Sequence, residues 1–108
     1  MSTAISLQAL RNIIEDGTPA EEGTRLANAL LSRDDVDWSD LTVDLRNMPI
    51  ELLNISFFYG FLQQISDTRT EILERARKVK WILSYRGLEE MIAAFMIKFR
   101  PRSERNAA

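Results

Sequence analysis

The stretch Leu41–Ile65, LTVDLRNMPIELLNISFFYGFLQQI, decides the expected fold of this chain. Its first part, Leu41–Leu45, is too short for a helix and contains residues that favour extended structure, so it predicts a strand. A turn that ends in proline follows at residues 46–49. The remainder is apolar at helical spacing, which predicts a helix from about Ile50 to Ile65. A strand followed directly by an apolar helix indicates an α/β protein in which the helix packs on a sheet.

This central helix carries more apolar side chains than one face of a sheet can cover. Its two stripes consist of Leu53, Phe57 and Phe61, predicted to face the core, and of Ile55, Phe58, Leu62 and Ile65. Ser56 and Gly60 lie four residues apart and predict a groove that another group can approach closely. The second stripe must be covered either by a partner or by an N-terminal helix, and we predict a surface for a protein partner beside the preceding turn. The residues expected to form this surface are Pro49, Glu51, Asn54, Ile55, Phe58 and Leu62.

Helix and strand signals recur on both sides of this stretch. Thr18 and Glu21 form a capping box, which predicts a helix that runs to about Ser32. An acidic loop follows over residues 33–40, and its Trp38 is expected to fold back on the body of the protein. The further predicted elements are helices over Thr68–Arg77 and Leu88–Phe99 and an alternating strand over Val79–Tyr85. The last helix is predicted to bury Leu88, Met91, Ile92, Phe95, Met96 and Phe99.

The N-terminal segment fits two interpretations. The spacing of its apolar residues predicts a short helix over Ser6–Asp16, but Ala4–Leu10 also reads as a strand. Two parallel strands alone would leave their edges unpaired, so either this segment or a second copy of the chain should complete the sheet. The expected fold is α/β, a small and mainly parallel sheet covered by helices, in the order α (or β)-α-β-α-α-β-α. We expect one domain over residues 1–100 and a flexible C-terminal tail over 101–108.

The composition excludes several kinds of chemistry. The 108 residues include neither Cys nor His, which removes disulfides, thiolate nucleophiles, imidazole bases and the metal ligands of both types. Asp44, at the end of its strand, is expected to cap the following turn. We expect no catalytic residue, no cofactor and no metal site. The paired carboxylates are predicted to be solvated, at helix starts or in the acidic loop, and they are Glu21-Glu22, Asp34-Asp35 and Glu89-Glu90.

Charge is unevenly distributed along a chain of net charge −2. Residues 1–54 hold four Arg against ten Asp and Glu, which is −6, and residues 55–108 hold ten Lys and Arg against six Asp and Glu, which is +4. Such a chain could pair head to tail or bind a partner electrostatically. The basic residues near the C-terminus are Lys98, Arg100, Arg102 and Arg105. They could contact nucleic acid or anionic lipid, but we expect them to complement the dipole of the last helix.

The sequence also contains no apolar run long enough to span a bilayer and no N-terminal export signal. We therefore expect a cytoplasmic protein with no membrane partner, and the net acidic charge predicts no nucleic-acid partner.

The order VDL, short turn and apolar helix with an early serine resembles the centre of the STAS domain of bacterial anti-sigma factor antagonists. It is still more similar to the divergent STAS-like regulatory domains, with LANALL before the strand and VKWILSYRGLEEMI after the helix, over roughly Glu21–Ile97. The resemblance implies no cofactor and docking onto a regulatory kinase or anti-sigma-like factor. In regulatory STAS domains this turn carries a phosphorylated Asp-Ser-Ser-Gly motif. That motif is absent here, where the corresponding stretch is Glu51–Asn54. Ser56 is the only hydroxyl near this place and so the one candidate for phosphorylation, and the alternative is that it is a small packing residue of the helix.

We predict a non-enzymatic, bacterial regulatory domain that acts in signal transduction by binding a protein through its central helix. Two alternatives remain open. One is a structural homodimer without a switch role, which completes its sheet or buries the second stripe across a twofold axis. The other is a small enzyme that uses carboxylates.

Overall fold

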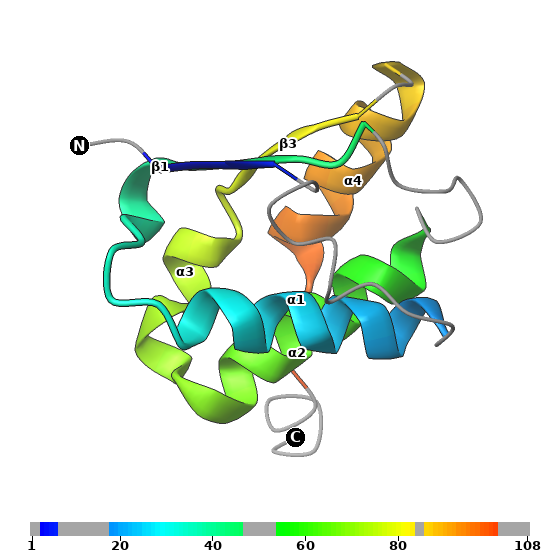
Figure 1. Ribbon diagram of the computed structural model, residues 1–108. Helices are drawn as coiled ribbons and strands as arrows, with labels where there is room; N and C mark the ends of the chain where they lie inside the picture. The colour runs from blue at the N-terminus through cyan, green and yellow to red at the C-terminus, as the bar shows by residue number, and fades with distance from the viewer. Residues whose placement is uncertain (1–2, 7–17, 47–53, 84–85, 102–108) are drawn as a thin grey trace.

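Three short parallel strands form one sheet in the order β1-β2-β3 (Figure 1). The computed structural model describes residues 3–6, 18–46, 54–83 and 86–101. In the middle of the sheet, β2 pairs in parallel with both neighbours, for example Ala4 with Thr42 and Thr42 with Lys80. The strands are β1 at Thr3–Ser6, β2 at Leu41–Asp44 and β3 at Lys80–Ile82. The α/β class and the parallel pairing predicted from the sequence are therefore confirmed.

The N-terminal segment supplies the third strand itself. Strand β1 pairs along its whole length with β2, so no second chain is needed to provide this strand. Of the two interpretations of this segment, the structure supports a strand over Thr3–Ser6, and residues 7–10 of the predicted strand lie outside the described part of the chain. Ser6, the first residue of the predicted helix over Ser6–Asp16, lies in β1, and the other residues of that helix lie outside the described part.

Helix α1, Pro19–Leu31, begins at the capping box predicted from the sequence. The Thr18 hydroxyl oxygen accepts a hydrogen bond from the backbone N–H of Glu21 at 3.3 Å, and the hydroxyl donates to the Glu21 carboxylate at 3.1 Å. Pro19 occupies the first turn, where its missing N–H costs nothing. The loop after α1 leads to the 3₁₀ turn η2, Trp38–Asp40, and Trp38 is buried as expected.

Helix α2, Ile55–Thr68, starts later than the predicted Ile50. Asn54 has an extended backbone, and its side-chain oxygen accepts from the N–H groups of Ser56 (2.9 Å) and Phe57 (3.3 Å). This is the geometry of an N-cap, so the helix begins immediately after Asn54. Residues 47–53 lie outside the described part of the chain.

The segment after α2 differs from the single helix predicted over Thr68–Arg77. It consists of the 3₁₀ turn η4, Thr70–Ile72, and the short helix α3, Leu73–Ala76. Thr68 is the last residue of α2, and the following η4 has no side-chain cap, so the predicted helix does not begin at Thr68. The chain ends with helix α4, Arg86–Lys98, and a buried Pro101, while the rest of the predicted tail lies outside the described residues.

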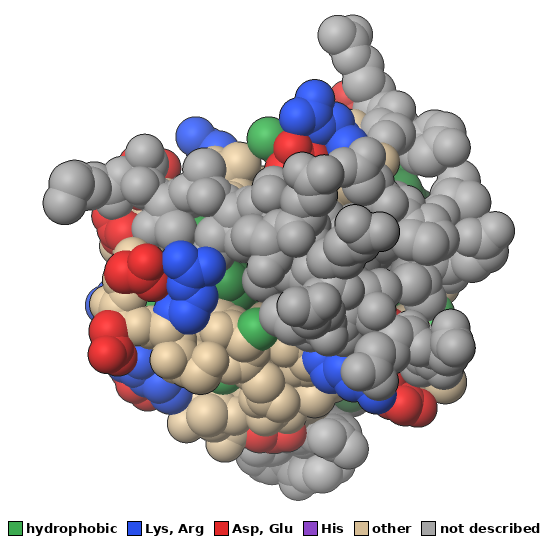
Figure 2. Space-filling view, viewed as in Figure 1, with side chains coloured by type: hydrophobic (Ala, Val, Ile, Leu, Met, Phe, Trp, Pro, Cys, Tyr) green, Lys and Arg blue, Asp and Glu red, His purple; other side chains and the backbone are tan. Residues whose placement is uncertain are grey.

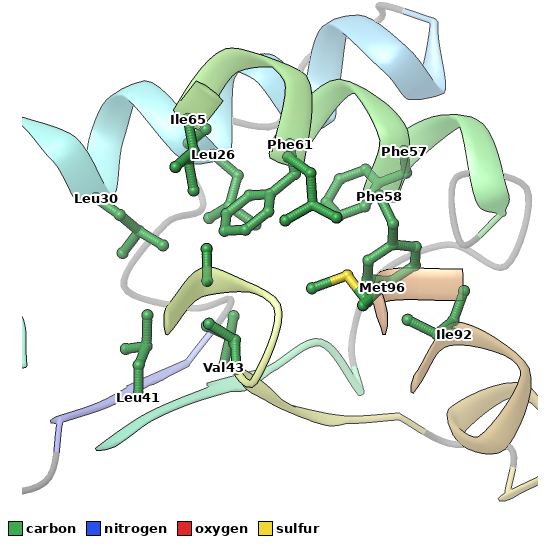
Figure 3. Close-up of a cluster of buried hydrophobic side chains, with 14 of the residues drawn as sticks. Leu26, Leu30, Leu41, Val43, Phe57, Phe58, Phe61, Ile65, Ile92 and Met96 are labelled. Carbon is green, nitrogen blue, oxygen red and sulfur yellow. The ribbon is translucent and has the colours of Figure 1, made fainter. Parts of the chain in front are cut away.

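The helices cover one face of the sheet (Figure 1). Leu41 and Val43 of β2 are buried beneath them, and Trp81 of β3 packs its ring against the rings of Phe58 and Phe61. Lys80 and Ile82 alternate with Trp81 and are exposed, as predicted for this strand. In Figure 3 the aromatic side chains of α2 extend toward the strands, and Ile92 and Met96 of α4 reach the same core.

Two glycines let α1 and α2 pack with their backbones close together. A Cβ atom on Gly23 would overlap the backbone oxygen of Phe57, and one on Gly60 would overlap the backbone oxygen of Ala20. The groove predicted at Gly60 therefore exists, and α1 of the same chain occupies it. Among the described residues, no helix is both long and apolar enough to cross a membrane.

Candidate functional site

Phe58 and Leu62, two members of the predicted partner surface, lie in the core. Both side chains are 0% exposed. The Phe58 ring makes edge-to-face contacts with Phe57 at 5.0 Å and with Trp81 at 4.9 Å between centroids. Figure 3 shows Phe58 beside Phe57 in the core. The assignment of Phe58 and Leu62 to a partner surface is therefore wrong, because neither side chain is accessible to a partner in this structure.

The error comes from the assumption that a sheet face is all that covers the central helix. Helix α2 also contacts α1, α3 and α4. Because these helices surround it, Ile65 of the second stripe is buried as fully as Phe57 and Phe61 of the first. The apolar excess of α2 is used within its own chain.

Other members of the predicted surface remain on the exterior, at the start of α2. Ile55 is 45% exposed and Ser56 is exposed, while Asn54 is half-buried and caps the helix. Pro49 and Glu51 lie outside the described residues. The first turn of α2 thus presents one large apolar side chain and one hydroxyl to solvent.

At the carboxyl end of β2, Asp44 caps the turn that follows, as predicted. Its carboxylate accepts a hydrogen bond from the backbone N–H of Arg46 at 3.0 Å. It also forms an ion pair with the guanidinium of Arg46 at 2.7 Å. These bonds from Arg46 lower the pKa of Asp44. Both groups are thereby used in local structure. No cluster of three metal-ligand side chains occurs within the described ranges.

A different exposed surface lies on α4. Ile97 is 71% exposed and Met91 is 45% exposed, and Ala93 and Ala94 between them are also exposed. The prediction that Met91 is buried is therefore wrong. Ile92, Met96 and Phe99 are buried as predicted, so this amphipathic helix still leaves apolar side chains in contact with water.

Beside Ile97 the surface is hollowed. A hollow of about 580 Å³ is lined by Glu74, Arg77, Lys78, Ile97, Lys98, Phe99 and Arg100. A smaller one of about 290 Å³ is lined by Tyr59, Phe95, Lys98, Phe99 and Arg100. The two hollows share Lys98, Phe99 and Arg100, so we treat them together and call them the α4 hollow.

Arg77 joins the two chain segments that form this hollow. Its Nη1 donates to the backbone carbonyl oxygens of Met96 and Ile97, each at 3.1 Å, and of Phe99. Its Nε donates to Glu74 at 3.2 Å, and the guanidinium lies 5.8 Å from the centroid of the Phe99 ring. Arg77 therefore satisfies carbonyl groups at the end of α4 that the helix leaves without partners, and its charge complements the helix dipole.

Three other cations of the α4 hollow behave differently. Lys78, Lys98 and Arg100 are exposed, and within the described residues none of their side chains forms an ion pair or a hydrogen bond. Five described arginines have carboxylate partners, whereas the exposed Arg75 and Lys80 form no described ion pair. On the face in Figure 2, blue and red side chains lie next to one another. The ion pairs are Arg25–Glu22, Arg33–Asp35, Arg46–Asp44, Arg69–Glu71 and Arg77–Glu74.

The sequence pattern does not predict this grouping. From the sequence, Lys98 and Arg100 are expected to complement the helix dipole, and Lys78 has no predicted role. A run of charge along the sequence cannot reveal the group, because Lys78 and Lys98 are twenty residues apart and the contacts of Arg77 with α4 bring them together.

Comparison of the chain with protein-family models, with curated proteins and with solved structures finds no significant match. The similarity to STAS-like domains therefore rests on the sequence pattern.

Proposed function

We propose that this chain is a non-enzymatic, STAS-like regulatory domain of the bacterial cytoplasm that binds another protein. The observation that carries the proposal is the exposure of Ile97, a large aliphatic side chain that is 71% in solvent at the edge of the α4 hollow. We assign the binding surface to the outer side of α4 in place of the central helix. The exposed first turn of α2, with Ile55 and Ser56, lies outside this surface.

The apolar side chains of α4 can supply a useful part of a binding free energy. Burial of a fully exposed Ile or Met side chain contributes about 1.5–3 kcal/mol. A micromolar complex corresponds to about 8 kcal/mol. Ile97 and Met91, which are partly exposed in the free chain, could therefore provide a substantial share.

The homodimer alternative has less support than it had from the sequence. Strand β1 supplies a third strand from within the chain, and the second stripe of α2 is buried by the same chain apart from Ile55. Neither of the two reasons for a dimer therefore requires a second copy.

Site-specific photo-crosslinking in cells tests the proposal. A photoreactive amino acid at position 97 should cross-link to a distinct protein, whereas the same group at the exposed position Asn28 of α1 should not. Adding Met91→Glu to the protein that carries the photoreactive group at position 97 should weaken the cross-link, because Met91 is the other large apolar side chain that α4 exposes. Equal labelling from positions 28 and 97, or cross-links only between copies of this chain, would contradict the proposal.

A further inference from the structure

We infer that the α4 hollow binds an acidic amphipathic segment of the partner, with carboxylates of that segment paired to Lys78, Lys98 and Arg100. The apolar side chains of the segment would cover Ile97. This inference rests on the proposed function and specifies the chemistry of the partner.

The first argument is the pattern of ion pairs. Five described arginines have carboxylate partners within the chain, whereas Arg75, Lys80 and the three exposed cations of the α4 hollow form no described ion pair. The three cations of the hollow differ from Arg75 and Lys80 because they line one hollow together. Glu74 is the one carboxylate among the described residues that line the larger hollow, and it is already paired with Arg77. Like charges close together raise each other's electrostatic energy, so added carboxylates are favoured there.

The sequence that follows does not neutralise this charge. Residues 102–108 contain two Arg and one Glu, so they add to the positive charge of the C-terminal part of the chain. An acidic partner is therefore complementary to the C-terminal part of the chain as well as to the hollow.

The second argument is the arrangement of apolar and charged groups. Ile97 and Phe99 line the same hollow as Lys78, Lys98 and Arg100. A ligand that fits must present apolar groups and several anions on one surface, which a helix with leucines on one side and glutamates beside them does. Inorganic phosphate alone would leave Ile97 in water.

A nucleic acid fits these observations less well. It would carry negative charge past a chain of net charge −2, whose first half has a net charge of −6. A short acidic protein segment meets the three cations without extending along that acidic half.

Three synthetic peptides provide the test. Each has about five helical turns and the same leucines at i, i+3, i+4 and i+7, and the remaining positions are Glu, Gln or Lys. By fluorescence anisotropy with the whole chain, the Glu peptide should bind more tightly than the Gln peptide, and the Lys peptide should not bind. Raising the salt concentration from about 0.05 M to about 0.5 M should weaken the binding of the Glu peptide, because salt screens the ion pairs.

Charge reversal locates the binding. The double variant Lys98→Glu, Arg100→Glu should bind the Glu peptide at least about tenfold more weakly than the unchanged chain does. Lys80→Glu is the matched control, since Lys80 is also an exposed lysine without a described ion pair but lies on the open face of the sheet. All variants change exposed side chains, and circular dichroism checks that they are folded. If the double variant does not fold, Lys78→Glu with Lys98→Gln replaces it.

The outcomes separate this inference from the proposed function. The inference is wrong if the Glu peptide does not bind. It is equally wrong if Lys80→Glu lowers the affinity for that peptide as much as the double variant does. It is also wrong if polyuridylate or phosphatidylserine vesicles bind through Lys98 and Arg100 in preference to the Glu peptide. In each case a cross-link at position 97 that depends on Met91 would leave the proposed function standing, and loss of that cross-link would remove both.

Discussion

At the scale of single residues, Phe58 decides whether the second stripe of the central helix is core or surface. Its side chain is fully buried between Phe57 and Trp81. We expect Phe58→Asp to destabilise the fold by more than about 4 kcal/mol, enough to unfold most of a marginally stable domain, because a carboxylate would be buried without a partner. Phe58→Leu should cost about 1–3 kcal/mol. Urea denaturation followed by circular dichroism measures both values.

The matched control for this prediction is the neighbouring position Ile55, which is 45% exposed. Ile55→Asp should change the free energy of unfolding by less than about 0.5–1 kcal/mol, since the new charge would lie in water at a helix N-terminus. Equal effects at the two positions would show that Phe58 is not a core residue.

Asp44 gives a prediction about pH. Its bonds from Arg46 lower the pKa of the folded carboxyl below the unfolded value of about 3.9. Their stabilisation is thus present above that value and is lost as the pH falls through the folded pKa. Asp44→Asn should reduce the free energy of unfolding at pH 7 by less than about 1 kcal/mol, since solvent screens the pair. In urea titrations the difference in the free energy of unfolding between the two proteins should disappear near pH 2. A difference that does not change with pH would show that the turn, and not the charge, is its cause.

At the scale of elements, the close packing of α1 on α2 depends on glycine. Gly23→Ala and Gly60→Ala would each place a methyl group against the backbone of the facing helix. We expect each to destabilise the protein by about 1–3 kcal/mol or more, because two helix backbones must move apart. Gly87 is the control: nothing lies near its Cβ position in the first turn of α4, so Gly87→Ala should be neutral or stabilise by up to about 1 kcal/mol. Thermal denaturation measures the stability of the three variants. Equal changes in all three would contradict a specific role of Gly23 and Gly60 in the packing of α1 on α2.

The end of α4 depends on Arg77. Arg77→Met keeps much of the side-chain volume but removes the donor that satisfies carbonyl oxygens of Met96, Ile97 and Phe99. We expect a loss of about 1–3 kcal/mol and faster amide hydrogen exchange in the last turn of α4. Glu74→Ala removes only the exposed partner of Arg77 and should have little effect on either measurement.

At the scale of the whole molecule, one continuous core joins the helices to the sheet. Trp38 of η2 is buried in this core and Trp81 of β3 packs against it. We therefore expect two-state unfolding, in which the variants Trp38→Phe and Trp81→Phe, each with one remaining tryptophan, show urea transitions that coincide with circular dichroism of the same variant. Separate midpoints for fluorescence and circular dichroism would show that the sheet and the helices unfold independently.

Several features could be predicted from the sequence because their physical causes are local. The capping box at Thr18, the strand at Leu41 and the alternation from Val79 to Leu83 each depend on neighbouring side chains and backbone preferences. Composition determined the available chemistry in the same direct way, since a chain without Cys and His lacks thiolates and imidazoles. The strand β1 was only one of two interpretations, because four residues are too few for a periodic signal and their pairing with β2 is a long-range contact.

Only the tertiary structure decided which apolar side chains are exposed to solvent and which cations lie close together. The second stripe of α2 looked exposed because the sequence does not show how many elements surround a helix, and here α1, α3 and α4 all contact it. The most exposed large apolar side chain, Ile97, lies on α4 instead, beside cations from two distant segments that Arg77 holds together. Local preferences determine the elements, whereas burial and the grouping of charge depend on how those elements pack.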